Sequence, residues 1–298
     1  MSKLEFTGER FVPGVRGEIW IEHWHRYHFA ARAVAGKRVL DVACGEGYGT
    51  ALLAQAAAEV TGVDLSAEAI DHAGRAYAGA RNARFVCAPC TKLPLADASI
   101  DVAVSFETLE HIAEQGPFLD ELARVLAPGG VAILSCPNKA EYSDRRGFKN
   151  EFHVKELYRD ELAALVSARF PAVEWYGQKP TFFSVIAPEG KAAGGQLVEV
   201  DEDDPSKARP RLSDPLYFLV VAGRGRAAID AVAPALSVMS DRGDWVHRDY
   251  EKVMKWMEQS VAYAQGLEKQ LEALGHPVKR RDWTRWVKLP FIRLGWLK

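Results

Sequence analysis

Short apolar segments alternate with helix-like segments through the middle of the chain. The amphipathic, helix-like stretches lie at 49–58, 66–80 and 118–126. The apolar runs lie at 38–43, 59–64, 83–88, 100–106 and 131–137. Strands that alternate with helices predict a mostly parallel sheet with helices on both faces, which is an α/β fold. A last apolar run, 215–223, predicts one more buried strand.

The flanks of this pattern divide the chain into three expected parts. Residues 1–35 predict a polar, aromatic lid with a helix from about Glu18 to Ala35, and 36–223 form the α/β domain. Within that domain, 188–215 is rich in Gly, Pro and acidic residues, which predicts a solvated mobile loop. A calcium loop is the alternative, but the spacing of the acidic residues does not match one. Residues 224–298 predict a helical extension.

The extension carries an apolar seven-residue repeat between 246 and 274. One set of positions is Tyr250, Met257, Ala264 and Leu271, and the other is Val246, Val253, Ser260, Leu267 and Leu274. Such a seam predicts a long coiled-coil helix that packs on another helix. Two partners remain open: a second copy of the chain in a homodimer, or the chain's own body.

Composition narrows the class of protein. The 298 residues include 38 basic and 40 acidic side chains, 48% apolar residues and four cysteines, which is typical of a globular protein without a disulfide framework. We find no apolar run of about 20 residues and no apolar signal core at the N-terminus, so a cytoplasmic location is expected.

The last twenty residues, 279–298, contrast with the rest of the chain. They hold seven basic residues and one acid, Asp282, among several aromatic residues. This composition is typical of a peripheral contact with the cytoplasmic face of the inner membrane, or of a contact with a partner protein. Folding back onto the chain's own helices is the alternative. Single-stranded nucleic acid is disfavoured because the remainder of the chain is acidic.

A glycine-rich turn after the first apolar run is the sharpest chemical signal. In VLDVACGEGYG a strand ends at Asp41, and Gly45, Gly47 and Gly49 lead into a helix near Thr50. A dinucleotide loop needs G-x-G-x-x-G, whereas this spacing is G-x-G-x-G. A carboxylate at Asp41 would repel a pyrophosphate and pair with an amine. The loop therefore favours S-adenosylmethionine (SAM), which carries an amine and no phosphate.

A second carboxylate, Asp64, ends the next strand, EVTGVD. There it is placed to accept hydrogen bonds from both ribose hydroxyls of a nucleoside. Together these motifs, with LPLADASIDVAVSFETLEHI and LARVLAPGG, make residues 37–137 resemble the class I SAM-dependent methyltransferases. The resemblance implies a Rossmann-like, seven-stranded, mostly parallel sheet whose last strand is antiparallel.

The resemblance also implies roles for individual residues. Asp41, Gly45 and Gly47 would hold the methionine end of SAM, Asp64 the ribose, and Leu65 the adenine. Many members bind the adenine amino group with an Asp after the third strand; here Pro89 stands near that position, so backbone groups around Cys90 take its place. The remaining cofactor-binding candidates are Phe106, which ends the fourth strand, and Tyr27 in the lid.

Flanking motifs narrow the resemblance further. Roughly residues 5–223 resemble a bacterial subgroup associated with the synthesis of surface polysaccharides and glycans. The motifs that carry this resemblance are TGERFVPG, EHWHRYHFAAR, SFETLEHI and NEFHVKELYRDEL. The resemblance implies methylation of a sugar hydroxyl, and it makes a glycan-assembly protein one candidate partner of segment 279–298. The alternatives are a quinone, lipid or natural-product acceptor, and a non-catalytic SAM-binding scaffold.

A sugar hydroxyl is a weak nucleophile, so a base is expected beside it. His111 is the first candidate, with Glu107 one helical turn before it, and His153 is the second, before a helix expected near Lys155. A packing role for either histidine stays open. The E-x-x-E-H spacing of Glu107, Glu110 and His111 also resembles a Mg²⁺ site of ubiquinone-type O-methyltransferases.

Other polar residues have less specific expectations. Arg10, His25 and Arg26 lie in the lid, where an arginine could bind the carboxylate of SAM or an acceptor phosphate. Cys87 and Cys90 lack a second cysteine pair at zinc spacing, so no zinc site is expected.

Overall fold

We analysed a computed structural model of the chain. It describes residues 11–275 except for 16, 182–196, 198, 201–207, 235, 241–242 and 244. Arg10 and the basic segment 279–298 therefore lie outside the described residues. The described chain divides into two compact units, residues 1–239 and 240–298.

The first unit is built on a seven-stranded sheet with the order β3-β2-β1-β4-β5-β9-β6. All strands are parallel except β9, which runs antiparallel to both of its neighbours, β5 and β6. The predicted Rossmann-like class I methyltransferase fold is thereby confirmed. The strands are β1 (Arg38–Val42), β2 (Glu59–Asp64), β3 (Ala83–Cys87), β4 (Ile100–Phe106), β5 (Leu126–Pro137), β6 (Ala172–Gln178) and β9 (Tyr217–Gly223).

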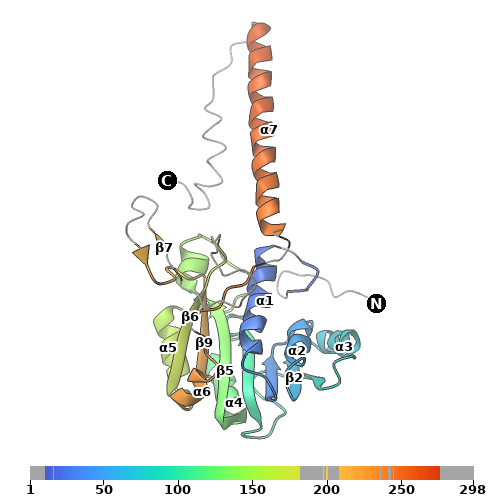
Figure 1. Cartoon of the computed structure of the whole chain (residues 1–298), viewed down its shortest axis with the longest axis vertical. Coiled ribbons are helices and arrows are strands. Elements are labelled where there is room, and N and C mark those ends of the chain that lie inside the picture. Colours follow the sequence, from blue (N-terminus) through green and yellow to red (C-terminus); the bar gives the residue numbers. More distant parts are fainter. Residues whose placement is uncertain are drawn as a thin grey trace, which may run out of the picture. The chain divides into compact units, whose positions relative to one another are not determined.

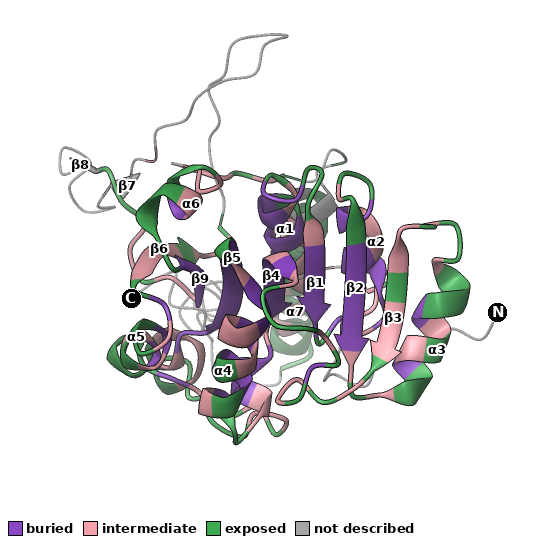
Figure 2. Ribbon diagram, turned by 90° about the horizontal axis from the view of Figure 1, so that it is seen from below, coloured by how far each residue is buried: buried purple, intermediate pink, exposed green. Residues whose placement is uncertain are grey.

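Helices cover both faces of this sheet (Figure 1). Alternate side chains of the strands point to opposite faces, so Leu40 packs with the helices of one layer and Val39 with those of the other. One layer holds α4 (Gln115–Val125) and α5 (Arg159–Ser167), and the other holds α1 (Glu18–Ala31), α2 (Tyr48–Leu53) and α6 (Arg226–Asp230). Figure 2 shows the burial concentrated in the central strands, whereas the edge strand β3 is partly exposed.

Several boundaries differ from the predicted ones. Helix α1 ends at Ala31 rather than Ala35, and α5 begins at Arg159 rather than near Lys155, because residues 151–157 form a loop bound to the end of β4. Helix α3 (Ala67–Ala76) begins at a Ser66 cap, as its sequence suggests. Strand β6 was missed as a strand: its partly buried side chains give no clear apolar run.

The acidic segment contains a short two-stranded ladder where only a loop was predicted. Strand β7 (Glu199–Val200) pairs antiparallel with β8 (Ala208–Arg209), and the acidic residues 201–204 lie outside the described residues. The first unit also extends past the expected boundary at Gly223, since Ile229 is fully buried and the Tyr176 hydroxyl donates to the Pro234 carbonyl.

The second unit contains the predicted long helix, α7 (Trp245–Ala273), which is one uninterrupted helix (Figure 1). Several of its apolar side chains are exposed to solvent, namely Val253, Trp256, Tyr263, Leu267 and Leu271, and so is Leu274 directly after the helix. Among the described helices, none combines the length and the apolar character needed to cross a membrane.

Candidate active site

Asp41 lies at the carboxyl end of β1, fully buried beneath the glycine-rich turn. The Thr50 hydroxyl donates to its carboxyl group at 2.6 Å, and the Tyr27 hydroxyl donates at 3.2 Å. Burial outweighs these bonds and raises the pKa of Asp41 to about 7. The described structure offers this carboxyl no cationic partner, so a bound ammonium group would stabilise its ionised form.

The glycines of the turn are required by close packing. Gly47 has φ +92°, and a Cβ on it would lie 2.6 Å from the Cβ of Ala73. A Cβ on Gly49 would lie 2.0 Å from the ring of Tyr27. The turn therefore fits only a bare backbone between α3 and the lid helix α1. Glu46, which the sequence analysis passed over, accepts hydrogen bonds from His72 and Tyr77 and so ties the turn to α3.

Asp64 is oriented by two backbone amides. The amides of Gly45 and Ser66 each donate to one of its carboxylate oxygens at 2.9 Å. The carboxyl ends of β1 and β2 are thereby joined through the glycine turn. Leu65 follows at once and is 73% exposed, which leaves an apolar surface beside Asp64. The chain after β3 returns to this point, since the Ala88 amide donates to the Asp64 carbonyl, and Cys90 is half-buried two residues on.

The two aromatic candidates meet next to Asp41. The rings of Tyr27 and Phe106 pack edge to face with centroids 5.0 Å apart. Tyr27 comes from α1 and Phe106 from the end of β4, so the lid helix and the sheet are in contact here. All eight predicted cofactor residues thus gather at the carboxyl ends of β1, β2, β3 and β4. This is the sheet edge at which α/β folds bind ligands.

The predicted helical turn from Glu107 to His111 is wrong. Glu107 has φ +53°, and the helical residues are only Leu109–His111, a short 3₁₀ helix. The backbone reverses at Glu107, so it does not share a face with His111. Instead, the Ser135 hydroxyl donates to the Glu107 carboxylate at 2.6 Å. Glu107 therefore belongs to a different cluster from His111.

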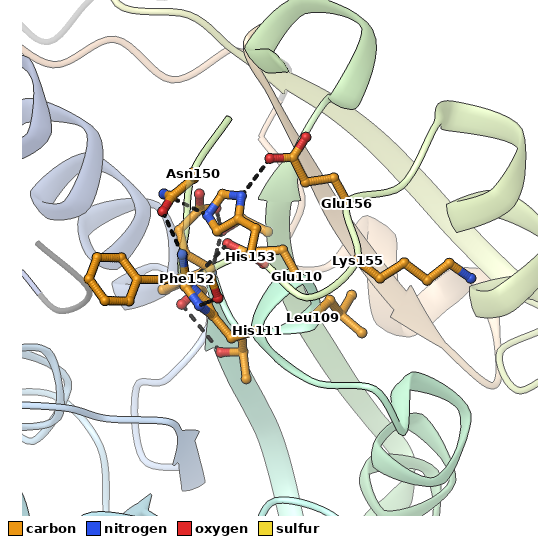
Figure 3. A network of polar contacts seen from close by, with 12 residues as sticks. Leu109, Glu110, His111, Asn150, Phe152, His153, Lys155 and Glu156 are labelled. Atoms are coloured by element: carbon orange, nitrogen blue, oxygen red, sulfur yellow. Dashed lines mark hydrogen bonds and ion pairs between the residues drawn. The ribbon is translucent and has the colours of Figure 1, made fainter. Parts of the chain in front are cut away.

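His111 lies beside Glu110 and His153 (Figure 3). Its Nδ1 is 3.0 Å from the carbonyl oxygen of Phe152, which accepts hydrogen bonds only, so Nδ1 carries the proton and Nε2 the lone pair. Glu110 is fully buried, its Oε1 lies 3.8 Å from His111 Nε2, and burial raises its pKa well above the usual range. A neutral imidazole with its lone pair on Nε2 is suited to accept a proton.

His153 is held on both sides of its ring (Figure 3). The Phe152 amide donates to Asn150 Oδ1, so the Asn150 NH₂ group faces His153 Nε2 at 3.0 Å. His153 Nε2 must then accept, and Nδ1 donates to Glu156 at 2.6 Å. Because the lone pair of His153 already accepts a hydrogen bond, His153 is poorly placed to act as a base in this arrangement.

The cluster that could hold a metal ion differs from the predicted one. Ligand atoms of Glu110, His111 and His153 all lie within 4.8 Å of one another, whereas Glu107 is not among them. Two nitrogens and one oxygen suit a transition metal better than Mg²⁺, which prefers oxygen. The residues fit an ion only in part, because Asn150 occupies the lone pair of His153 and burial favours the protonated form of Glu110.

Arg26 stands in a second cluster, above strands β9 and β6. Its Nε donates to the Gln178 side chain at 2.8 Å, its guanidinium lies over the ring of Tyr217, and Glu107 Oε1 is 3.6 Å from Nη2. Tyr217 in turn donates to Glu22 at 3.0 Å. The sequence placed Arg26 in the lid but could not show these partners. His25, another lid residue, points elsewhere and contacts the Ser237 hydroxyl.

The order and directions of the strands are those of the class I methyltransferase fold. Residues 40–134 match the family model described as a methyltransferase domain. This match covers β1 to β5, which carry Asp41, Asp64 and His111.

Curated relatives extend the match. A probable S-adenosylmethionine-dependent methyltransferase of Mycolicibacterium smegmatis is 39% identical over 173 residues, 55% of this chain and 64% of that protein. Another of Mycobacterium tuberculosis is 38% identical over 55% of this chain and 60% of that protein. The chain thus spans somewhat less than two thirds of these relatives.

A ubiquinone biosynthesis O-methyltransferase of Psychrobacter arcticus is 36% identical over 37% of this chain and 44% of that protein. Among solved structures, the YcgJ protein of Bacillus subtilis aligns with a TM-score of 0.48 and 18% identity, which covers 68% of this chain and all of that chain.

Proposed function

We propose that this protein is a SAM-dependent methyltransferase that methylates a sugar hydroxyl of a surface glycan or of its precursor. One observation carries the methyltransferase part: two carboxyl groups, Asp41 and Asp64, lie at the ends of adjacent parallel strands and are linked by a turn whose Gly47 and Gly49 leave no room for a side chain. The family match over 40–134 supports the same conclusion.

In this proposal the residues at the ends of β1 and β2 bind the cofactor. The ionised Asp41 accepts from the ammonium group of the methionine end, and the Gly45–Gly47 backbone lies against it. Asp64, already oriented by two amides, accepts from the ribose hydroxyls, and the exposed Leu65 packs on the adenine with the backbone near Cys90. Tyr27 and Phe106 exclude water beside Asp41. When bound, SAM supplies an activated methyl group.

His111 is the proposed general base. Its Nε2 takes the proton of the acceptor hydroxyl, and the hydrogen bond from Nδ1 to the Phe152 carbonyl keeps the ring in the tautomer that can do so. His153 has a positioning role, since Asn150 and Glu156 fix its ring edge-on to His111 with centroids 4.9 Å apart.

A sugar acceptor agrees with the side chains around this base. Tyr142 stacks on His153 and lies near Tyr217, which belongs to the second cluster, where Glu107 and Arg26 contribute polar groups. Aromatic faces suit the C–H face of a sugar ring, and the polar groups suit its hydroxyls. A quinone ring could use the same aromatic faces, and the ubiquinone-related relative keeps this alternative in the test.

Transfer of tritiated methyl from SAM tests the activity and the acceptor together. We expect label in bacterial glycan extracts and none in quinone precursors. His111→Ala should lower the rate about 10²-fold, since a general base contributes on the order of 10²–10⁴. His28→Ala, an exposed histidine of α1, is the matched control and should leave the rate unchanged.

The other outcomes each identify a different error. Label only in quinone precursors would refute the sugar acceptor. Binding of S-adenosylhomocysteine without any methylated product would favour the scaffold alternative. Loss of activity in EDTA, with recovery on adding a divalent transition metal, would replace the metal-free base by a metal site at Glu110, His111 and His153.

We further propose that the reaction takes place at the cytoplasmic face of the membrane, through segment 279–298. Its mixture of basic and aromatic residues supports this location. The full chain should sediment with vesicles containing anionic lipid and remain free with neutral ones. Equal behaviour with both vesicle types would contradict a membrane contact of this kind.

A further inference from the structure

Arg26 is the largest fully buried charged side chain whose hydrogen bonds are incomplete in the described part of the molecule. A guanidinium has five N–H donors. Only Nε has an acceptor, the Gln178 side chain, and both Nη1 and Nη2 lack a hydrogen-bond partner there. Buried polar groups are nearly always paired, because an unpaired one costs free energy. The terminal nitrogens of Arg26 therefore point to a ligand.

The neighbouring acids do not fill this role. Glu107 Oε1 stays 3.6 Å from Nη2, beyond hydrogen-bond distance, and is held by the Ser135 hydroxyl instead. Glu22 accepts from Tyr217, and burial raises the pKa of Glu22 to about 7, so it carries only part of a negative charge at neutral pH. The guanidinium thus keeps both the charge and the free edge needed for a second anion.

Two of the described partners of Arg26 lie in strands well removed from Asp41. These partners, Tyr217 and Gln178, are paired with each other at the adjoining ends of β9 and β6. In the sheet, β9 lies three strands from β1, which carries Asp41, or about 14 Å at the usual strand spacing. Glu107, 3.6 Å from Nη2, follows β4, which is the neighbour of β1, so the affinity for S-adenosylhomocysteine is measured below to separate an acceptor anion from the carboxylate of SAM.

We propose that Arg26 binds an oxyanion, a phosphate or a carboxylate, carried by the methyl acceptor. This rests on the proposed methyltransferase function, and it narrows the acceptor to an anionic molecule such as a sugar phosphate or an acidic sugar. The two terminal nitrogens form the planar fork that holds such groups with paired hydrogen bonds. Tyr217 beneath the guanidinium and Glu107 beside it fix the orientation of the fork.

Anion binding by the full chain tests this proposal. Calorimetric titrations with inorganic phosphate and with acetate, at constant ionic strength, would be run with and without S-adenosylhomocysteine. We expect one site per chain, and Arg26→Gln should weaken it at least about tenfold. Arg32→Gln, an exposed arginine that caps the same helix, is the control and should bind as the wild type does.

Affinity for S-adenosylhomocysteine separates the acceptor from the cofactor. Arg26→Gln should leave this affinity within about twofold of the wild type. A tenfold loss would assign the guanidinium to the carboxylate of SAM and overturn the proposal, as would unchanged phosphate and acetate binding in Arg26→Gln. Comparison of phosphate with acetate shows which oxyanion the site prefers.

Two measurements keep the test decisive if Arg26→Gln does not fold. Arg26→Lys retains the positive charge but loses the two parallel N–H donors of the guanidinium. Its affinity for the anion should therefore be measurable but lower than that of the wild type. Wild-type crystals soaked in selenate should show anomalous density at Nη1 and Nη2 of Arg26; density only elsewhere would refute the site. If the wild type binds no S-adenosylhomocysteine, the methyltransferase proposal fails while the anion titration still decides the role of Arg26.

Discussion

Ala43 carries backbone strain at the centre of the proposed cofactor site. It has φ +59°, a conformation that costs a residue with a Cβ about 1–2 kcal/mol, and its side chain is exposed. Ala43→Gly should therefore raise the free energy of unfolding by about 0.5–1 kcal/mol, after the greater freedom of glycine in the unfolded chain is subtracted. Denaturant unfolding checks this. A lower midpoint would mean that the methyl group makes a contact that outweighs the strain.

The protonation of Asp41 makes cofactor affinity depend on pH. Its pKa of about 7 means that the carboxyl is mostly neutral at pH 6 and ionised at pH 8. Only the ionised form pairs with an ammonium group, so affinity for S-adenosylhomocysteine should rise between pH 6 and 8, by at most about tenfold per unit, and then level off. Binding near pH 6.5 should release a proton from Asp41. Calorimetry detects this release as a difference in binding enthalpy between two buffers of different ionisation enthalpy.

Two variants separate Asp41 from the other groups that titrate in this range. Asp41→Asn should abolish the rise, whereas Glu22→Gln, which removes the other carboxyl with a pKa of about 7, should keep it. The groups that face Asp41 are Thr50, Tyr27 and Asp64. A rise that persists in Asp41→Asn would assign the titration to a group other than Asp41.

The same shift affects stability with the opposite sign. In the unfolded chain an aspartate ionises near pH 4, whereas the folded Asp41 keeps its proton up to about pH 7. Between these values the folded state binds more protons. The contribution of Asp41 to stability is therefore complete below about pH 4 and is lost as the pH rises to about 7.

The sequence predicted the positions of site residues that belong to local motifs. It did not predict contacts between residues that are far apart in the chain. Asp41 and Asp64 follow apolar runs next to a glycine turn, so their placement could be read directly. The bond between Arg26 and Gln178 joins residues 152 positions apart, and the one between His111 and Phe152 joins residues 41 apart. Such contacts arise from the packing of α1 and the loop after β5 on the sheet, which periodicity does not encode.

At the scale of elements, the turn after β4 shows how a local backbone choice changes a site. Helical spacing predicted that Glu107 and His111 share a face, but Glu107 adopts φ +53° and its amide bonds to Ser135 on the adjacent strand β5. A hydrogen bond between Ser105 and Thr108 closes the turn. Hydrogen bonding to β5 therefore outweighs helix propensity in this turn. As a result, the Glu107 side chain lies beside Arg26, whereas the Glu110 side chain lies beside His111.

The contact between the lid helix and the glycine turn should be essential for cofactor binding. Gly49→Ala puts a methyl group into the ring of Tyr27, which must then leave Asp41. We expect at least a tenfold loss of S-adenosylhomocysteine affinity and a loss of about 1–3 kcal/mol of stability. Gly74→Ala is the control, since it has open space within α3 and should stabilise the protein by about 0.5–1 kcal/mol. Wild-type affinity in Gly49→Ala would show that Tyr27 is dispensable.

At the scale of the whole molecule, helix α7 bears on the choice that the sequence left open between a homodimer and packing on the chain's own body. Leu267, Leu271 and Leu274 are 42%, 43% and 74% exposed, although all three belong to the seven-residue repeat. Burial of one such side chain stabilises an interface by about 1.5–3 kcal/mol, so a seam of this length suffices for a dimer. We therefore expect the full chain to self-associate through 246–274, with α7 packed on α7 of a second copy.

Sedimentation equilibrium of the full chain tests this assembly. Val253→Glu with Leu267→Glu places two like charges in the seam and should weaken association at least about 100-fold, because each would be buried without a partner. Gln259→Glu, an exposed position outside the repeat, adds one such charge and should leave association intact. A wild-type chain that stays monomeric at all accessible concentrations would contradict self-association through the repeat. If the double variant associates as strongly as Gln259→Glu, the contact lies outside the repeat. The double variant should retain methyl transfer at the wild-type rate, since β1–β5 and their site residues belong to the other unit.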